Sequence, residues 1–191
     1  LLTIPIRMNA LNTLVAVDDA VVKNGRNDKK SFGKAKMMNV EMNASQINRN
    51  QVSYVKFDLS GVDRQKINAA IFQVYGNSTI GHPYRFHVYA LDNNNWNENT
   101  LNWTNAPNLE KKQIRITDVG TTAHVAGEIV VDKTAAYHQL DVTELLRNCR
   151  EQEITFVLIR EVRQLGDDSD NGKSCLFGTK ESKNGPILSI W

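Results

Sequence analysis

The sequence is short of cysteine, of proline and of long hydrophobic runs, and each shortage excludes a class of protein. Its 191 residues include two cysteines and four prolines. Cys149 and Cys175 are too few for a disulfide-stapled scaffold, and they form either one bridge or two small buried side chains. No stretch approaches the roughly 20 apolar residues of a membrane-spanning helix, so we expect no membrane insertion.

The chain also lacks a large excess of positive or negative charge. Lysine and arginine total 23, aspartate and glutamate total 21, and the net charge is +2. A nucleic-acid-binding protein usually carries a basic excess or a basic run, and the sequence indicates neither. We therefore expect no nucleic-acid partner.

Catalytic motifs are scarce too. The four histidines lack a metal-ligand spacing such as HExxH, and no nucleophile elbow or phosphate loop stands out. HPYRFHVY (82–89) has the tyrosine, histidine and arginine of a lyase, but a core strand with one polar face explains it more simply. The sequence leaves open whether two carboxylates form a pair that cleaves glycosidic bonds, because the folded structure sets the distance between such groups. We expect no enzyme, with a lyase or hydrolase as the less favoured alternative.

What the sequence does have is a repeated two-residue alternation of apolar and polar side chains. Runs rich in Val, Ile, Tyr and Phe, bounded by Gly, Asn, Asp and Pro, are typical of strands. Ten such runs lie at 15–22, 35–42, 52–60, 69–77, 84–92, 129–134, 138–143, 153–161, 173–180 and 186–191.

Ten strands in 191 residues predict an all-β fold, an antiparallel β-sandwich of the jelly-roll kind. The one helix candidate is 141–149, where Asp141 or Thr143 is able to cap the first turn. We expect one domain over 1–191, with 1–14 as an edge strand or the remnant of a domain boundary. Because the chain starts without Met or a signal pattern, we expect it to be excised from a larger protein.

Calcium is the expected cofactor. The loop DDSDNG (167–172) places Asp168 and Asp170 at alternate positions, like the opening of a calcium loop, but it lacks the later bidentate glutamate. An ordinary acidic turn is the simpler alternative. Asp18 and Asp19 point to opposite faces of a regular strand, so only one of them serves a given ion. We name Asp19, Asp168 and Asp170 as candidate ligands of a structural Ca²⁺.

Sugar recognition generally needs aromatic faces, together with guanidinium or ammonium groups for carboxylates and hydroxyls. Such side chains lie in or beside several of the predicted loops. For each cation taken alone, a surface salt bridge is the simpler interpretation. The candidate ligand-binding residues are Tyr84, Arg85, Arg160, Arg163 and Lys180.

Several motifs, in order, resemble a known family. They are DDAVV (18–22), SFG (31–33), YVKFDLS (54–60), INAAIFQVY (67–75), WNENTLNWTNAP (96–107), LDVTELL (140–146), FGTKE (177–181) and PILSI (186–190). The set is similar to the secreted bacterial β-sandwich module called the DNRLRE domain, which overlaps carbohydrate-binding module family 96. The resemblance runs from about residue 15 to the end. The segment 108–139 departs from it by its length, and a long insertion beside a sandwich edge is a place for a specialised ligand site.

The resemblance implies a non-catalytic module, secreted, periplasmic or on a bacterial cell surface, attached to catalytic or surface domains. It implies acidic polysaccharides, such as alginate or pectin-like chains, as ligands. The alternative is a structural or adhesion module that binds no free glycan. Because the tryptophan motif is shared across a family with many ligands, we predict that Trp96 and Trp103 pack structurally. On this interpretation Glu98 and Thr100 bond loop backbone.

Overall fold

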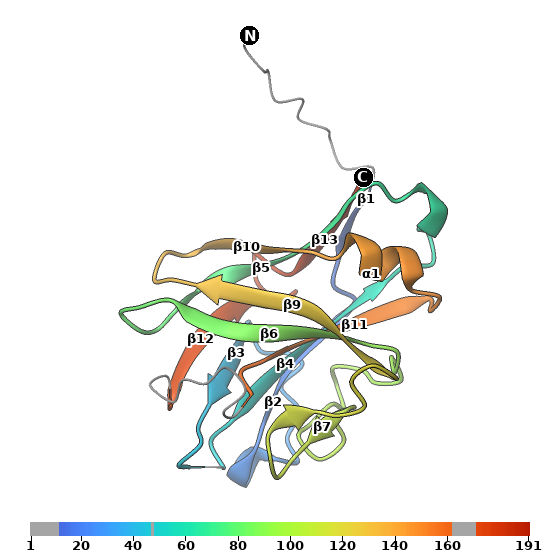
Figure 1. The fold of residues 1–191 in the computed structure, drawn as a ribbon. Coiled ribbons are helices and arrows are strands. Elements are labelled where there is room, and N and C mark those ends of the chain that lie inside the picture. Colours follow the sequence, from blue (N-terminus) through green and yellow to red (C-terminus); the bar gives the residue numbers. More distant parts are fainter. Residues whose placement is uncertain (1–11, 47, 162–170) are drawn as a thin grey trace.

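The computed structural model describes residues 12–46, 48–161 and 171–191, and this part of the chain is mostly β-structure (Figure 1). It holds thirteen strands, one α-helix and two 3₁₀ turns. The strands are β1 (Asn12–Val15), β2 (Asp18–Lys23), β3 (Met37–Met42), β4 (Gln51–Asp58), β5 (Ala70–Ser78), β6 (Tyr84–Leu91), β7 (Leu109–Glu110), β8 (Arg115–Ile116), β9 (Ala123–Val131), β10 (Ala136–Asp141), β11 (Glu153–Ile159), β12 (Lys173–Gly178) and β13 (Ile187–Ile190). The helical elements are η1 (Gly25–Asn27), η2 (Arg64–Lys66) and α1 (Thr143–Asn148).

In the part of the chain that the structure describes, no helix has the length and apolar character needed to cross a membrane.

The strands form two antiparallel layers. The first contains β1, β13, β5, β12 and β3, with β10 added on β5, and the second contains β2, β4, β11, β6 and β9. The layers are continuous through a single residue pair between β3 and β4, Glu41 with Gln51. The arrangement is an all-β sandwich, as predicted.

The main core lies between the layers. Phe57 on β4, Phe72 on β5 and Phe156 on β11 are fully buried, with ring centroids 4.5–6.1 Å apart. Val55 shares this core with Phe57, whereas Tyr54 faces the other way. The two faces of β4 are therefore separated as the two-residue alternation in the sequence requires.

The second layer is buried on its outer face as well, which the alternation did not predict. The segment 92–122 folds over that face, and its apolar side chains pack with those of β2, β4, β6 and β11. Strands β4 and β11 are consequently buried along almost their whole length. The cover contributes Leu101, Trp103, Ala106, Leu109, Ile114 and Ile116.

All ten predicted strands are present, and three short ones were not predicted. β1, β7 and β8 have four, two and two residues, too few to show a periodic pattern. The stretch 105–128 holds β7, β8 and the first two thirds of β9. In β9 the apolar Val125 and Val130 are exposed, so the sequence there lacks a regular alternation of buried apolar and exposed polar residues.

Two smaller expectations are also decided. Helix α1 forms within the expected 141–149, but its N-cap is Val142, which makes no side-chain cap hydrogen bond, and not Asp141 or Thr143. Asp141 Oδ1 accepts hydrogen bonds from the backbone N–H and the hydroxyl of Thr143 at 2.9 and 2.6 Å. Cys149 and Cys175 are both free thiols.

Candidate functional site

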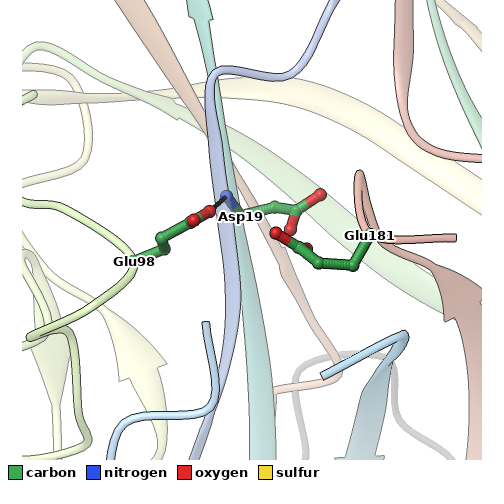
Figure 2. A group of neighbouring side chains, drawn as sticks. All are labelled: Asp19, Glu98 and Glu181. Atoms are coloured by element: carbon green, nitrogen blue, oxygen red, sulfur yellow. Dashed lines mark hydrogen bonds between the residues drawn. The ribbon is translucent and has the colours of Figure 1, made fainter. Parts of the chain in front are cut away.

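Three motifs that lie far apart in the sequence meet at one group of charged side chains (Figure 2). Asp19 lies on β2, Glu98 in the loop after β6, and Lys180 and Glu181 directly after β12. Lys34, from the loop before β3, pairs with Glu98. These five residues are referred to below as the charged node.

Glu98 is the centre of the charged node. Its side chain is 5% exposed, and Oε1 pairs with Nζ of Lys34 at 2.6 Å and with Nζ of Lys180 at 2.9 Å. Oε2 accepts a hydrogen bond from the backbone N–H of Asp19 at 3.3 Å. Burial alone would raise the pKa of Glu98, but these hydrogen bonds outweigh it and hold the pKa below its ordinary value. Glu98 is therefore a buried anion whose charge is balanced by two lysines and a backbone N–H.

Asp19 is in the opposite state. Its side chain is fully buried, Oδ2 accepts from the backbone N–H of Lys180 at 2.7 Å, and Oδ1 has no hydrogen-bond partner. Burial, reinforced by the neighbouring Glu181 and Glu98, raises the pKa of Asp19 to about 7 against the opposing bond from Lys180. Asp19 therefore has an oxygen that lacks a donor and a proton that it releases only near neutrality.

Glu181 adds a second oxygen of the same kind. Its Oε1 accepts from Nζ of Lys180 at 2.9 Å, whereas its buried Oε2 has no hydrogen-bond partner. The hydrogen bonds that Lys180 gives to Glu181 and Glu98 raise the pKa of its ammonium group. A buried acceptor without a donor is costly, so these two oxygens mark where a further positive group fits.

The motif SFG (31–33) holds Glu98 in place from the other side. Ser31 Oγ donates to the backbone oxygen of Glu98 at 2.6 Å. A Cβ atom on Gly33 would lie 2.1 Å from that same oxygen, so only glycine permits this approach of the two loops.

The two tryptophans pack structurally, as predicted. Trp103 is 4% exposed within the cover formed by 92–122. Trp96 is half-buried; its Nε1 donates to Thr155 Oγ1 at 2.9 Å, and its ring meets Tyr54 edge-on at 5.9 Å. Nζ of Lys56 lies 4.6 Å from the centre of the Trp96 ring and donates to the backbone oxygen of Trp96. The motif WNENTLNWTNAP thus builds the cover and delivers Glu98.

A second candidate site is a polar depression at the end of β2 and in the connection from β3 to β4. Its volume is about 520 Å³. It offers three cations, Lys23, Arg26 and Arg49, and one acid, Glu41, which accepts a hydrogen bond from Gln51 at 2.6 Å. Every other lining residue carries a side-chain amide: Asn24, Asn27, Gln46, Asn48, Asn50 and Gln51. This set is hereafter the polar depression.

Some of these amides build the wall and others remain at its surface. Asn24 Oδ1 accepts from the backbone N–H of Asn50 at 2.7 Å, and Asn50 Oδ1 accepts from that of Asn43 at 2.7 Å. Arg26 and Arg49 are exposed, and Lys23 lies with its Nζ 4.5 Å from the centre of the Phe32 ring. The wall is therefore tied down, while the guanidinium groups face solvent.

Gly25 permits the two halves of the polar depression to touch, and replacing it should separate them. Its φ is +73°, and a Cβ would lie 2.4 Å from the backbone oxygen of Asn48. We expect Gly25→Ala to lower the free energy of unfolding by about 1–2 kcal/mol from the left-handed conformation alone, and by more once the clash is included. Gly120→Ala is the control, because Gly120 has φ +92° and open space around it. Urea unfolding that gives equal losses for the two variants would contradict the close approach.

The segment 23–36, KNGRNDKKSFGKAK, links the polar depression to the charged node. It contains six cations and one acid. The expectation that the chain has no basic run was therefore wrong, because a net charge taken over the whole chain conceals this segment. Lys29, Lys30 and Lys36 are exposed, so this end of the sandwich is strongly positive.

Four of the five predicted ligand-binding residues lie in the described part of the chain, and the structure distributes them over different environments. Tyr84, expected as an exposed aromatic, is fully buried, and Arg160 is 3% exposed with Nη1 donating to the backbone oxygen of Arg85 at 2.6 Å. Arg85 is exposed on β6 and pairs with Glu128 at 3.6 Å. Lys180 belongs to the charged node. The expected exposure of Tyr84 was therefore wrong, and a role in ligand binding stays a prediction for all four of these residues.

Three predicted residues, Arg163, Asp168 and Asp170, lie outside the described residues. Of the three predicted calcium ligands, only Asp19 is therefore placed, and it lies in the charged node. Within 82–89, His87 Nε2 pairs with Glu128 at 3.2 Å, and the ring centroid of His87 lies 6.0 Å from that of Tyr89.

Fold and site together define a β-sandwich module with a cationic, amide-lined depression at its loop-bearing end. The sequence profile of carbohydrate-binding module family 96 matches residues 10–190, and the chain belongs to this family. It is thus a carbohydrate-binding module. No individual curated protein matches the chain.

Proposed function

We propose that this module binds an acidic, uronate-containing polysaccharide in the polar depression and has no catalytic activity of its own. The observation that carries the proposal is the lining of the depression. Two exposed guanidinium groups and a lysine stand among planar amides, with a single acid that is already bonded to Gln51.

The chemistry of this lining matches a carboxylated sugar. Arginine binds carboxylates through two parallel N–H donors, and amides satisfy hydroxyl groups as donor and acceptor. No aromatic residue lines the depression within the described residues, so stacking on a neutral pyranose has no surface there. The exposed lysines of 23–36 extend the positive surface beyond the depression, as a charged polymer requires.

Affinity electrophoresis in gels containing alginate, polygalacturonate or a neutral glucan tests the proposal. The double variant Arg26→Glu/Arg49→Glu should weaken retardation by an acidic polymer about tenfold or more, a loss of roughly 1.4 kcal/mol or greater. Retardation of the unaltered chain should also weaken with added salt, because exposed charges are screened.

The control is Lys66→Glu/Lys133→Glu, which changes the net charge equally at exposed positions outside the depression. It should keep most of the retardation. If Arg85→Glu abolishes binding and the double variant does not, the site lies on β6 instead. No retardation by any polymer would favour a structural or adhesion module.

The wider setting of the module follows from the same proposal. We propose that it acts outside the cell, attached to a polysaccharide-degrading enzyme, and holds that enzyme on its substrate. A catalytic role for the module itself would appear as turnover of the polymers in the same gel panel.

A further inference from the structure

We propose that Asp19, Glu98 and Glu181 form a binding site for one calcium ion, for which the chain's own Lys180 ammonium group competes. One carboxylate oxygen from each of the three acids lies within 4.8 Å of the others. The three come from β2, from the loop after β6 and from the segment after β12, so an ion there would join three distant parts of the chain.

The unpaired oxygens are what distinguish this group from an ordinary acidic cluster. Asp19 Oδ1 and Glu181 Oε2 are buried and accept no hydrogen bond, and Asp19 is fully buried. Figure 2 shows the Asp19 side chain extending from its strand toward the carboxylate of Glu181. Buried anionic oxygens without donors are unfavourable unless a cation or a proton lies beside them.

The donor set selects the ion. All three ligands are carboxylates, with no histidine or cysteine in the group, which favours a hard cation over Zn²⁺. Calcium binds oxygens at 2.3–2.6 Å, so two of its ligands lie at most about 5.2 Å apart, and the 4.8 Å limit of this group fits. Magnesium binds at 2.0–2.1 Å, demands a near-ideal octahedron and usually keeps several waters instead of an all-protein set of ligands. The flexible coordination of calcium therefore suits three carboxylates from separate segments better.

Lys180 is the internal competitor. Its Nζ lies 2.9 Å from Oε1 of Glu98 and 2.9 Å from Oε1 of Glu181, so the ammonium group already neutralises two of the three acids. Its side chain is 25% exposed and that of Glu181 is 19% exposed, so the ammonium group has a path to solvent when an ion enters. Its backbone N–H, bonded to Asp19 Oδ2, is able to stay in place.

Calcium chloride titrated into the chelator-treated chain tests the site by calorimetry and by thermal unfolding. We expect calorimetry to show one calcium ion bound per chain, at the charged node. The melting temperature should rise by about 5–10 °C once free calcium exceeds the dissociation constant a hundredfold. Because this titration contains no polysaccharide, a negative result would contradict the calcium site without contradicting the proposed binding of a polysaccharide.

Two variants should move calcium affinity in opposite directions. Glu181→Gln removes the negative charge of one ligand at a half-buried position, and should weaken binding about tenfold or more. Lys180→Met keeps the aliphatic stem, removes the competing charge and should tighten binding about tenfold or more. Lys133→Met, at an exposed position elsewhere, is the control and should leave the affinity unchanged.

Several results would overturn the site. One is the absence of a calcium effect in both the unaltered chain and Lys180→Met. Another is an affinity that Glu181→Gln leaves unchanged while Asp168→Asn/Asp170→Asn abolishes binding, which would place the ion in the loop 167–172. A melting temperature raised by Zn²⁺ and not by calcium would contradict the choice of ion.

Discussion

Replacing Trp103 by alanine is expected to lower the free energy of unfolding by about 3–5 kcal/mol, the cost of removing a large aromatic side chain from a packed core. Trp103 is 4% exposed and belongs to the apolar cluster between the cover 92–122 and the outer face of the second layer. Truncation leaves a cavity under the cover, and the buried outer faces of β4 and β11 lose part of their packing.

Urea unfolding measures the loss, and Trp96→Phe is the matched comparison. That variant keeps a ring beside Tyr54 and Lys56 but loses the hydrogen bond from Nε1 to Thr155, so it should cost about 1 kcal/mol. Both variants should still bind polysaccharide under conditions where they are folded. A stable Trp103→Ala variant that no longer binds would instead make the tryptophan motif a sugar-binding surface.

The sequence predicted the fold well because the alternation of a strand is a local property. Val55 and Phe57 in one direction and Tyr54 in the other can be assigned from neighbouring residues alone. What periodicity does not reveal is a strand buried on both faces. The alternation in β4 suggested one solvent-facing side, and only the cover folded from 92–122 makes that side a second core.

The expected exposure of Tyr84 was wrong for a reason already present in the sequence. Tyr84 has the same parity as the apolar Phe86 and Val88 on β6, and all three are buried. Arg85, of opposite parity, is exposed as alternation requires. The aromatic type of Tyr84 was given more weight than its position in the strand.

The charged node could not be derived from spacing. Asp19 and Glu98 are 79 residues apart, and Asp19 and Lys180 are 161 residues apart, so no local pattern relates them. The only signal was that each lies in a motif of the family resemblance. Motifs common to family members that bind different ligands indicate structural contacts, and the charged node is such a contact. The basic segment 23–36, by contrast, was visible in the sequence once charge was counted over a window.

Stability of the metal-free protein is expected to fall as pH rises from about 4 to about 7, through the carboxyl group of Asp19. Its pKa is about 7 in the folded chain, against an ordinary value of 3.8. Between these values the folded chain holds a proton that the unfolded chain has released, so each step upward in pH favours unfolding. The contribution is complete below the ordinary pKa and is lost as pH passes the raised one. Three pKa units correspond to about 4 kcal/mol.

Asp19→Asn isolates this contribution, because asparagine carries no titrating proton and its side-chain oxygen is able to accept from Lys180. The ionisation of Glu98 raises stability with rising pH, but it does so at lower pH, since the pKa of Glu98 lies below its ordinary value. The free energy of unfolding, measured in urea with a chelator present, should therefore decline between about pH 5 and pH 7 in the unaltered chain and stay flatter in Asp19→Asn. Parallel curves for the two chains would mean that Asp19 is already ionised in the folded protein at acidic pH. The unpaired oxygen Oδ1 would then need a positive partner even without metal.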